Sequence, residues 1–132
     1  MTITKMRKLA FVAMIALTMG LIGCRTAPVY NVEEAPVNAS GKVSAENVKK
    51  AIMSAGAGLG WQMKEVKPGQ IVGSIFLRKH SAVVDIPYSA TKYSIIYKDS
   101  TELKYDGSMI HSNYNGWIQN LDRAIQARLV AM

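Results

Sequence analysis

The sequence contains few of the residues that form disulfides, metal sites or catalytic centres in small proteins. It has one cysteine and two histidines in 132 residues. A single cysteine excludes an intramolecular disulfide and a cysteine-based zinc cluster. Charged residues make up 19% of the chain and hydrophobic residues 49%, which excludes a fully disordered protein. A chain of this length is expected to form one domain.

The chemically reactive side chains form no recognisable catalytic or metal-binding motif. His80 and His111 have no further ligand at helical or hairpin spacing, so we predict no metal site. No serine lies in a G-x-S-x-G motif. The spacing of Asp85, Asp99 and Glu102 singles out no pair of catalytic carboxylates. We therefore predict that the protein is not an enzyme and has no cofactor.

The N-terminus has the composition of an export signal. Three basic residues, Lys5, Arg7 and Lys8, precede an uncharged apolar run at 9–24. This run of 16 residues is shorter than the roughly 20 that a transmembrane helix needs. We predict that residues 1–23 are a secretory signal peptide, with a retained N-terminal membrane anchor as the alternative.

The end of the apolar run is more specific than a general cleavage site. Leu21-Ile22-Gly23-Cys24 resembles the lipobox of bacterial lipoprotein precursors, which ends in an obligatory cysteine. The resemblance implies that a peptidase cuts after Gly23 and that Cys24 carries a thioether-linked diacylglycerol. Two or three acyl chains make such an anchor stable, since one chain binds only marginally. The expected partner of Cys24 is therefore membrane lipid.

The residue after the lipobox bears on the destination of the protein. In the Gram-negative lipoproteins that the motif resembles, Asp at this position favours the inner membrane, whereas this chain has Arg25. We therefore expect the periplasmic face of the outer membrane, or the cell membrane if the protein is not sorted outward. Loss of residues 1–23 would leave 13 basic residues against nine acidic ones, a net charge of +4. Nucleic acid is not an expected partner.

The segment after the lipobox has the composition of a linker. It contains Pro28, Pro36 and Gly41 and has no sustained hydrophobic period. We predict that residues 24–42 are the lipidated cysteine and an extended tether, which would reach about 60 Å when fully stretched. The alternative is that part of it, at 29–32, pairs with a sheet edge.

The remaining residues, 43–132, predict one periplasmic α+β domain. Ser44 is a suitable N-cap for a helix with apolar residues every three or four positions, which ends at the glycines of 56–60. Four strand-like runs follow, and then a helix capped by Ser112 or Asn113. Because the connections are short, we expect a four-stranded antiparallel meander. The expected fold has two layers, with both helices on one sheet face.

The side-chain pattern of the strand runs predicts their registers. A two-residue turn at His80-Ser81 would place Leu77 opposite Val84 on the core face. Pairing of Tyr88 with Tyr93 would place the apolar side chains of the next strand on the same core face. The runs that these pairs connect are Trp61–Val66, Ile71–Lys79, Ala82–Tyr88 and Tyr93–Asp99.

The first hairpin needs an irregularity. A plain two-residue turn at Pro68-Gly69 would place Trp61 and Met63 on the face away from the core. We therefore predict a three-residue loop or a bulge in this hairpin.

The opposite face of the predicted sheet mixes apolar and charged residues. It forms a candidate partner surface centred on Phe76 and Ile96, with Arg78, Val83 and Lys98 beside them. The alternative is an ordinary solvated sheet face. With the lipid anchor and the lack of catalytic residues, this surface favours a non-enzymatic envelope protein that binds a protein partner.

One polar and aromatic stretch suggests an alternative function. His111, Asn113 and Asn115, next to Tyr114 and Trp117, are candidate glycan contacts, because aromatic faces stack on sugars and amides bond to hydroxyl groups. The stretch is equally suited to starting a helix, with its aromatic residues in the core. A lipoprotein that binds peptidoglycan or another glycan is the alternative function.

The C-terminal half also resembles a family. It is similar to small proteobacterial lipoproteins over about 61–129, on Tyr97-Lys98-Asp99-Ser100, Leu103, Tyr105, Ile110-His111 and Tyr114–Ile118. This resemblance implies an α+β periplasmic domain. It implies no activity and no functional residue beyond Cys24.

Overall fold

The computed structural model describes residues 25–132, and the predicted signal peptide with Gly23 and Cys24 lies outside them. No helix among the described residues is both long and apolar enough to cross a membrane. The elements, in chain order, are β1 (Thr26–Pro28), β2 (Val32–Pro36), α2 (Ala45–Gly58), β3 (Gln62–Lys67), β4 (Gln70–Leu77), β5 (His80–Pro87), β6 (Lys92–Thr101), β7 (Met109–His111) and α3 (Ser112–Val130).

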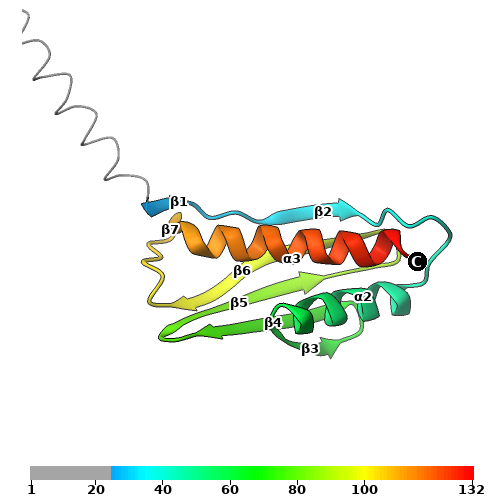
Figure 1. Cartoon of the computed structure of the whole chain (residues 1–132), viewed down its shortest axis with the longest axis horizontal. Coiled ribbons are helices and arrows are strands. Elements are labelled where there is room, and N and C mark those ends of the chain that lie inside the picture. The colour runs from blue at the N-terminus through cyan, green and yellow to red at the C-terminus, as the bar shows by residue number, and fades with distance from the viewer. Residues whose placement is uncertain (1–24) are drawn as a thin grey trace, which may run out of the picture.

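The strands form a five-stranded antiparallel sheet and a separate two-stranded one. The large sheet has the order β2-β6-β5-β4-β3, and β1 pairs with β7. Figure 1 shows α2 and α3 side by side over the same face of the large sheet. The predicted α+β class with an antiparallel sheet is confirmed. The predicted count of four strands is wrong, because β2 adds a fifth strand at the edge.

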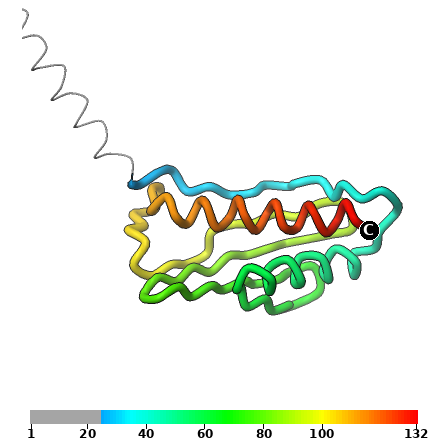
Figure 2. Tube along the Cα trace, in the orientation of Figure 1, coloured from blue at the N-terminus to red at the C-terminus, as the bar shows by residue number. Residues whose placement is uncertain are grey.

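The segment after residue 24 belongs to the fold and is not a free tether. Val32 of β2 pairs with Ile95 of β6 and is 6% exposed. Figure 2 shows the trace of this segment running from one end of the molecule to the other. The predicted domain boundary at residue 43 is therefore wrong. The alternative prediction, pairing with a sheet edge, describes this segment better, although the edge strand is 32–36 and not 29–32.

Two of the hairpins follow the predicted registers. The β3–β4 pairing has a bulge between Glu65 and Lys67, and Trp61 is buried as a result. Tyr88 pairs with Tyr93 at the start of the β5–β6 pairing. The bulge confirms that the first hairpin needs one extra residue to keep its apolar side chains on the core face.

The β4–β5 hairpin turns two residues earlier than predicted. Its turn is at Arg78-Lys79, so Leu77 pairs with His80 and not with Val84. Because side chains alternate across a strand with a period of two, a slip by an even number of residues keeps each side chain on its face. The register prediction is therefore wrong, whereas the predicted face is correct for the residues that lie within the two strands.

The two helices begin with different caps. Ser44 accepts a hydrogen bond from the Asn47 backbone N–H at 3.1 Å, and the Asn47 side chain accepts one from the Ser44 N–H at 3.2 Å. In α3 the cap is His111, whose Nδ1 accepts from the Asn113 N–H at 3.1 Å. The prediction of Ser112 or Asn113 is wrong, because both residues lie within the helix and the His111 ring nitrogen accepts from a free backbone N–H of its first turn.

The core lies between the two helices and the large sheet. Two glycines, Gly56 in α2 and Gly73 in β4, leave room for Met63, because a Cβ at either position would press into that side chain. Burial of these apolar faces supplies most of the stabilisation of such a domain. From α3 the core receives the residues at helical spacing, Tyr114, Ile118, Leu121, Ile125 and Leu129.

A part-buried polar link at the margin of the core joins β6 to α3. The Tyr93 hydroxyl donates to Asp122 Oδ1 at 2.5 Å and accepts from Gln126 Nε2 at 2.6 Å. Burial, and then the neighbouring Asp122 carboxylate, raise the pKa of Tyr93 well above its ordinary value. The hydroxyl therefore remains a hydrogen-bond donor throughout the physiological range.

Candidate functional site

The face of the large sheet opposite the helices is open. The strand registers place Val72 beside Asp85 and Asp85 beside Ile96, with Val83 two residues from Asp85 on the same face. These four residues are partly exposed, and Phe76 is 65% exposed, the highest value among the large hydrophobic residues described. We call this surface the open face, made of Val72, Phe76, Val83, Asp85, Ile96 and Lys98.

The structure brings together four of the five residues predicted for the partner surface. Phe76, Val83, Ile96 and Lys98 lie on neighbouring strands β4, β5 and β6. Arg78 does not lie with them, because the earlier turn places it between β4 and β5 with a φ of 60°. The four residues therefore share one face as expected, and only the placement of Arg78 is wrong. Binding of a partner to this face stays a prediction.

The charged groups of the open face pair with each other. Lys98 Nζ lies 3.3 Å from Asp85 Oδ1, and Gln70 Nε2 donates to the same oxygen at 3.3 Å. Exposed ion pairs of this kind contribute about 0–1 kcal/mol to stability. The pair matters more for recognition, because it leaves the open face without a strong net charge.

The three candidate glycan contacts have different roles in the structure. His111 caps α3 through its ring nitrogen. Asn115 uses both ends of its amide, accepting from the Tyr30 N–H and donating to the Pro28 carbonyl, each at 2.9 Å. Asn113 is exposed. The three residues therefore do not form one exposed polar cluster.

Sequence reasoning missed the residues that hold the N-terminal segment to the domain. Besides Asn115, the Asn31 side chain accepts a hydrogen bond from the Tyr97 backbone N–H at 2.9 Å. Glu34 pairs with Lys92 of β6 at 2.9 Å. An asparagine amide can accept from a backbone N–H and donate to a backbone carbonyl at the same time. Asparagine residues are therefore the sequence signal that could have indicated this contact.

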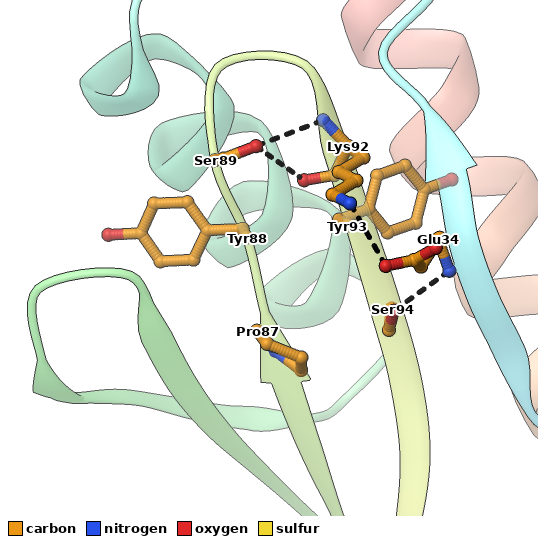
Figure 3. Close-up of a pocket in the computed structure, with 7 residues that line it drawn as sticks. All are labelled: Glu34, Pro87, Tyr88, Ser89, Lys92, Tyr93 and Ser94. Atoms are coloured by element: carbon orange, nitrogen blue, oxygen red, sulfur yellow. Dashed lines mark hydrogen bonds and ion pairs between the residues drawn. The ribbon is translucent and has the colours of Figure 1, made fainter.

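A small pocket lies where β2 meets the turn between β5 and β6 (Figure 3). The rings of Tyr88 and Tyr93 point away from one another there, and Lys92 reaches the Glu34 carboxylate. Its volume of about 190 Å³ is below the roughly 300 Å³ at which ligand pockets begin. Its charged groups are already paired, so we assign it no chemistry. The lining residues are Glu34, Pro87, Tyr88, Ser89, Lys92, Tyr93 and Ser94.

The titratable residues considered for catalysis are bound locally. Asp85 pairs with Lys98, and Asp99 accepts a hydrogen bond from the Ser100 N–H at 2.8 Å. Within residues 25–132, no group of three or more His, Cys, Asp or Glu residues is arranged to hold a metal ion.

Comparison of the chain with protein-family models, with curated proteins and with solved structures finds no match. Function is therefore inferred from the residues and contacts of this chain alone.

Proposed function

We propose that the protein is a non-enzymatic, lipid-anchored component of the cell envelope that binds a protein partner through the open face. The lipobox at 21–24 supports the anchor, and Arg25 supports the periplasmic face of the outer membrane as its location. The architecture supports a binding module, because the helices bury one sheet face and leave the other to solvent.

Phe76 is the observation that carries this proposal. It is 65% exposed on β4, opposite Ser81. The partly exposed apolar residues Val83 and Ile96 follow on the same face, Val83 diagonally across on β5 and Ile96 farther along, opposite Asp85. Aromatic anchors of this kind contribute a large share of binding energy when a partner encloses them. The Asp85–Lys98 pair lies beside the apolar residues, which matches an interface with an apolar centre and polar surroundings.

The chemistry of the open face specifies the kind of partner. A complementary surface would enclose Phe76 in an apolar pocket and offer hydrogen-bonding groups to Asp85 and Lys98. Because these two charges pair with each other, the partner needs no strong charge of its own. We therefore expect a folded protein surface with an apolar centre, and not a strongly acidic or basic polymer.

Site-specific photo-crosslinking in growing cells tests this proposal. A photoreactive amino acid is placed at Phe76 of the full chain and, as a matched control, at Val130, which is 59% exposed at the end of α3. We expect a discrete protein adduct from position 76 and none of that size from position 130. Identical adducts from both positions, or none from position 76, would contradict a partner on the open face.

Peptidoglycan binding is the alternative function. The net positive charge of the processed chain and the exposed Asn113 support it, whereas Asn115 is engaged with the backbone of the N-terminal segment. Sedimentation with purified peptidoglycan separates the two functions. No co-sedimentation would remove the alternative, and co-sedimentation that persists in Phe76→Ser would favour it over the open face.

A further inference from the structure

Only a very short stretch of chain connects the predicted lipid anchor to the folded domain. β1 begins at Thr26, two residues after Cys24, and pairs with β7. Asn115 fixes the chain at the end of β1, because it donates to the Pro28 carbonyl and accepts from the Tyr30 N–H. Two residues span at most roughly 7 Å. If Cys24 is anchored, the end of the domain that carries β1 therefore lies at the membrane surface.

The same end of the domain carries two exposed connections. Ser81 pairs with Thr101, which places the Arg78-Lys79 turn next to the point where the loop 102–108 leaves β6. Figure 1 shows this turn, this loop and β1 at one end of the molecule, and the end of α3 at the other. We call the residues of the turn and the loop, with Arg25 and Leu77, the anchor end.

The anchor end combines exposed apolar side chains with basic ones. Leu77 is 45% exposed and Tyr105 is 42% exposed. The acidic residues of the loop are Glu102 and Asp106, and the Asp106 carboxylate accepts hydrogen bonds from two backbone N–H groups of its own loop. The four basic residues of the anchor end take part in no ion pair among the described residues: they are Arg25, Arg78, Lys79 and Lys104.

This combination matches the chemistry of a phospholipid surface. Basic side chains near a membrane are attracted to anionic lipid headgroups, and the attraction falls off within a Debye length of about 8 Å. Tyrosine and leucine side chains favour the boundary between headgroups and acyl chains, where an apolar body meets a polar layer. The two-residue link brings the start of β1 within that distance of the lipid, and the turn and the loop lie at the same end of the domain (Figure 1).

We propose that the anchor end docks on the phospholipid headgroups of the membrane that holds Cys24, an inference that rests on the proposed lipid anchor. Arg78 and Lys79 contact lipid phosphates, and Leu77 and Tyr105 lie at the level of the interface. The strands of the large sheet then point away from the membrane. The open face stands side-on to the membrane. Its part around Val72, Asp85 and Ile96, four residues farther from the turn than Phe76, remains accessible to a partner in the periplasm.

Spin labels on the acylated full-length protein test this orientation. The protein is reconstituted in vesicles of phosphatidylethanolamine and phosphatidylglycerol that contain a nickel-chelating lipid, with one new cysteine at Lys79 or, as the control, at Asn38. An eight-residue strand such as β4 is about 26 Å long, so the two ends of the sheet differ strongly in their distance from the headgroups. We expect relaxation by the nickel lipid to be at least about threefold greater at position 79 than at position 38. Equal relaxation at the two positions would overturn the docking while leaving the anchor intact.

A charge-matched pair of variants tests the role of the turn. The label is placed at Ser108, and Arg78→Glu/Lys79→Glu is compared with Lys42→Glu/Lys50→Glu, which changes the net charge equally at exposed sites elsewhere. We expect the first variant to lose about half or more of the relaxation at Ser108 and the second to keep it. Equal losses would overturn the assignment to the turn, and circular dichroism checks that both variants are folded. A protein whose intact mass shows no lipid would instead refute the proposed function, and the docking with it.

Discussion

Asn115 in α3 holds the backbone of Tyr30, which lies 85 residues earlier in the chain. Its Oδ1 accepts from the Tyr30 N–H, and its Nδ2 donates to the Pro28 carbonyl, both at 2.9 Å. The two strands that this side chain helps to fix are only three and five residues long. One amide of α3 therefore supplies two of the hydrogen bonds that fix the segment next to the predicted lipid.

Replacement of Asn115 by alanine is expected to loosen the N-terminal segment. The change removes two hydrogen bonds and leaves two backbone groups without a protein partner, which costs about 1–3 kcal/mol. Hydrogen exchange at the Tyr30 amide should accelerate, and the free energy of unfolding in urea should fall. Asn113→Ala, at an exposed position two residues away, serves as the control and should change neither. Unchanged exchange at Tyr30 in Asn115→Ala would contradict the proposed contact.

The stability of the domain is expected to fall at alkaline pH. Burial raises the pKa of Tyr93 and of Tyr114 above the ordinary value of 10.0. Below pH 10 both tyrosines are protonated in the folded and unfolded states, so their contribution is fully present. Above pH 10 the unfolded chain releases protons that the folded chain retains, so the free energy of unfolding falls by up to about 1.4 kcal/mol per pH unit for each tyrosine.

Urea unfolding between pH 9 and pH 11.5, at intervals of about half a pH unit, measures this effect. Tyr93→Phe removes one of the two groups and should make the decline above pH 10 shallower. The same slope in the variant and the wild type would show that Tyr93 is not protected from ionisation in the folded state.

Removal of the Tyr114 hydroxyl is expected to affect stability differently from removal of the Tyr93 hydroxyl. Tyr114 is buried, and its hydroxyl has no hydrogen-bond partner in the described part of the chain. Tyr114→Phe should therefore leave the free energy of unfolding unchanged or raise it by about 1 kcal/mol. Tyr93→Phe should lower it by about 1–3 kcal/mol, because Asp122 and Gln126 lose their common partner. Urea unfolding at neutral pH compares the two variants, and equal losses would contradict this assignment.

Substitution of the open face should separate binding from folding. Phe76→Thr/Ile96→Thr keeps β-branched or strand-compatible residues on β4 and β6 but removes the apolar centre of the surface. Because both positions lie on the face away from the helices, we expect the thermal midpoint to change by only a few degrees. Adduct formation from a photoreactive residue at Val83 should be lost. Retention of the adduct would show that Phe76 and Ile96 do not supply the binding energy at this face.

The helices and the sheet faces were predictable because periodicity encodes them directly. The apolar residues that recur at helical spacing in α3, from Tyr114 to Leu129, are all buried. The β4–β5 register was not predictable in the same way. Pairing Leu77 with His80 or with Val84 leaves every side chain on the same face, so alternation does not distinguish the two registers.

The N-terminal strands were missed because their stabilisation is not local. β2 contributes a single buried residue, Val32, and the contacts that fix the segment come from Tyr97 and Asn115, far along the chain. Two prolines in the segment also favoured a linker. The candidate site was predicted better: alternation alone placed Phe76, Val83 and Ile96 on one face, and only the turn residue Arg78 was misplaced.

Intact-mass spectrometry of the protein purified from membranes tests the lipid anchor most directly. The account predicts a chain that begins at Cys24 and carries the added mass of a diacylglycerol with a further acyl chain. It also predicts that Cys24→Ser is not processed to this form. A full-length chain that retains Met1 and an unmodified Cys24 thiol would contradict the account.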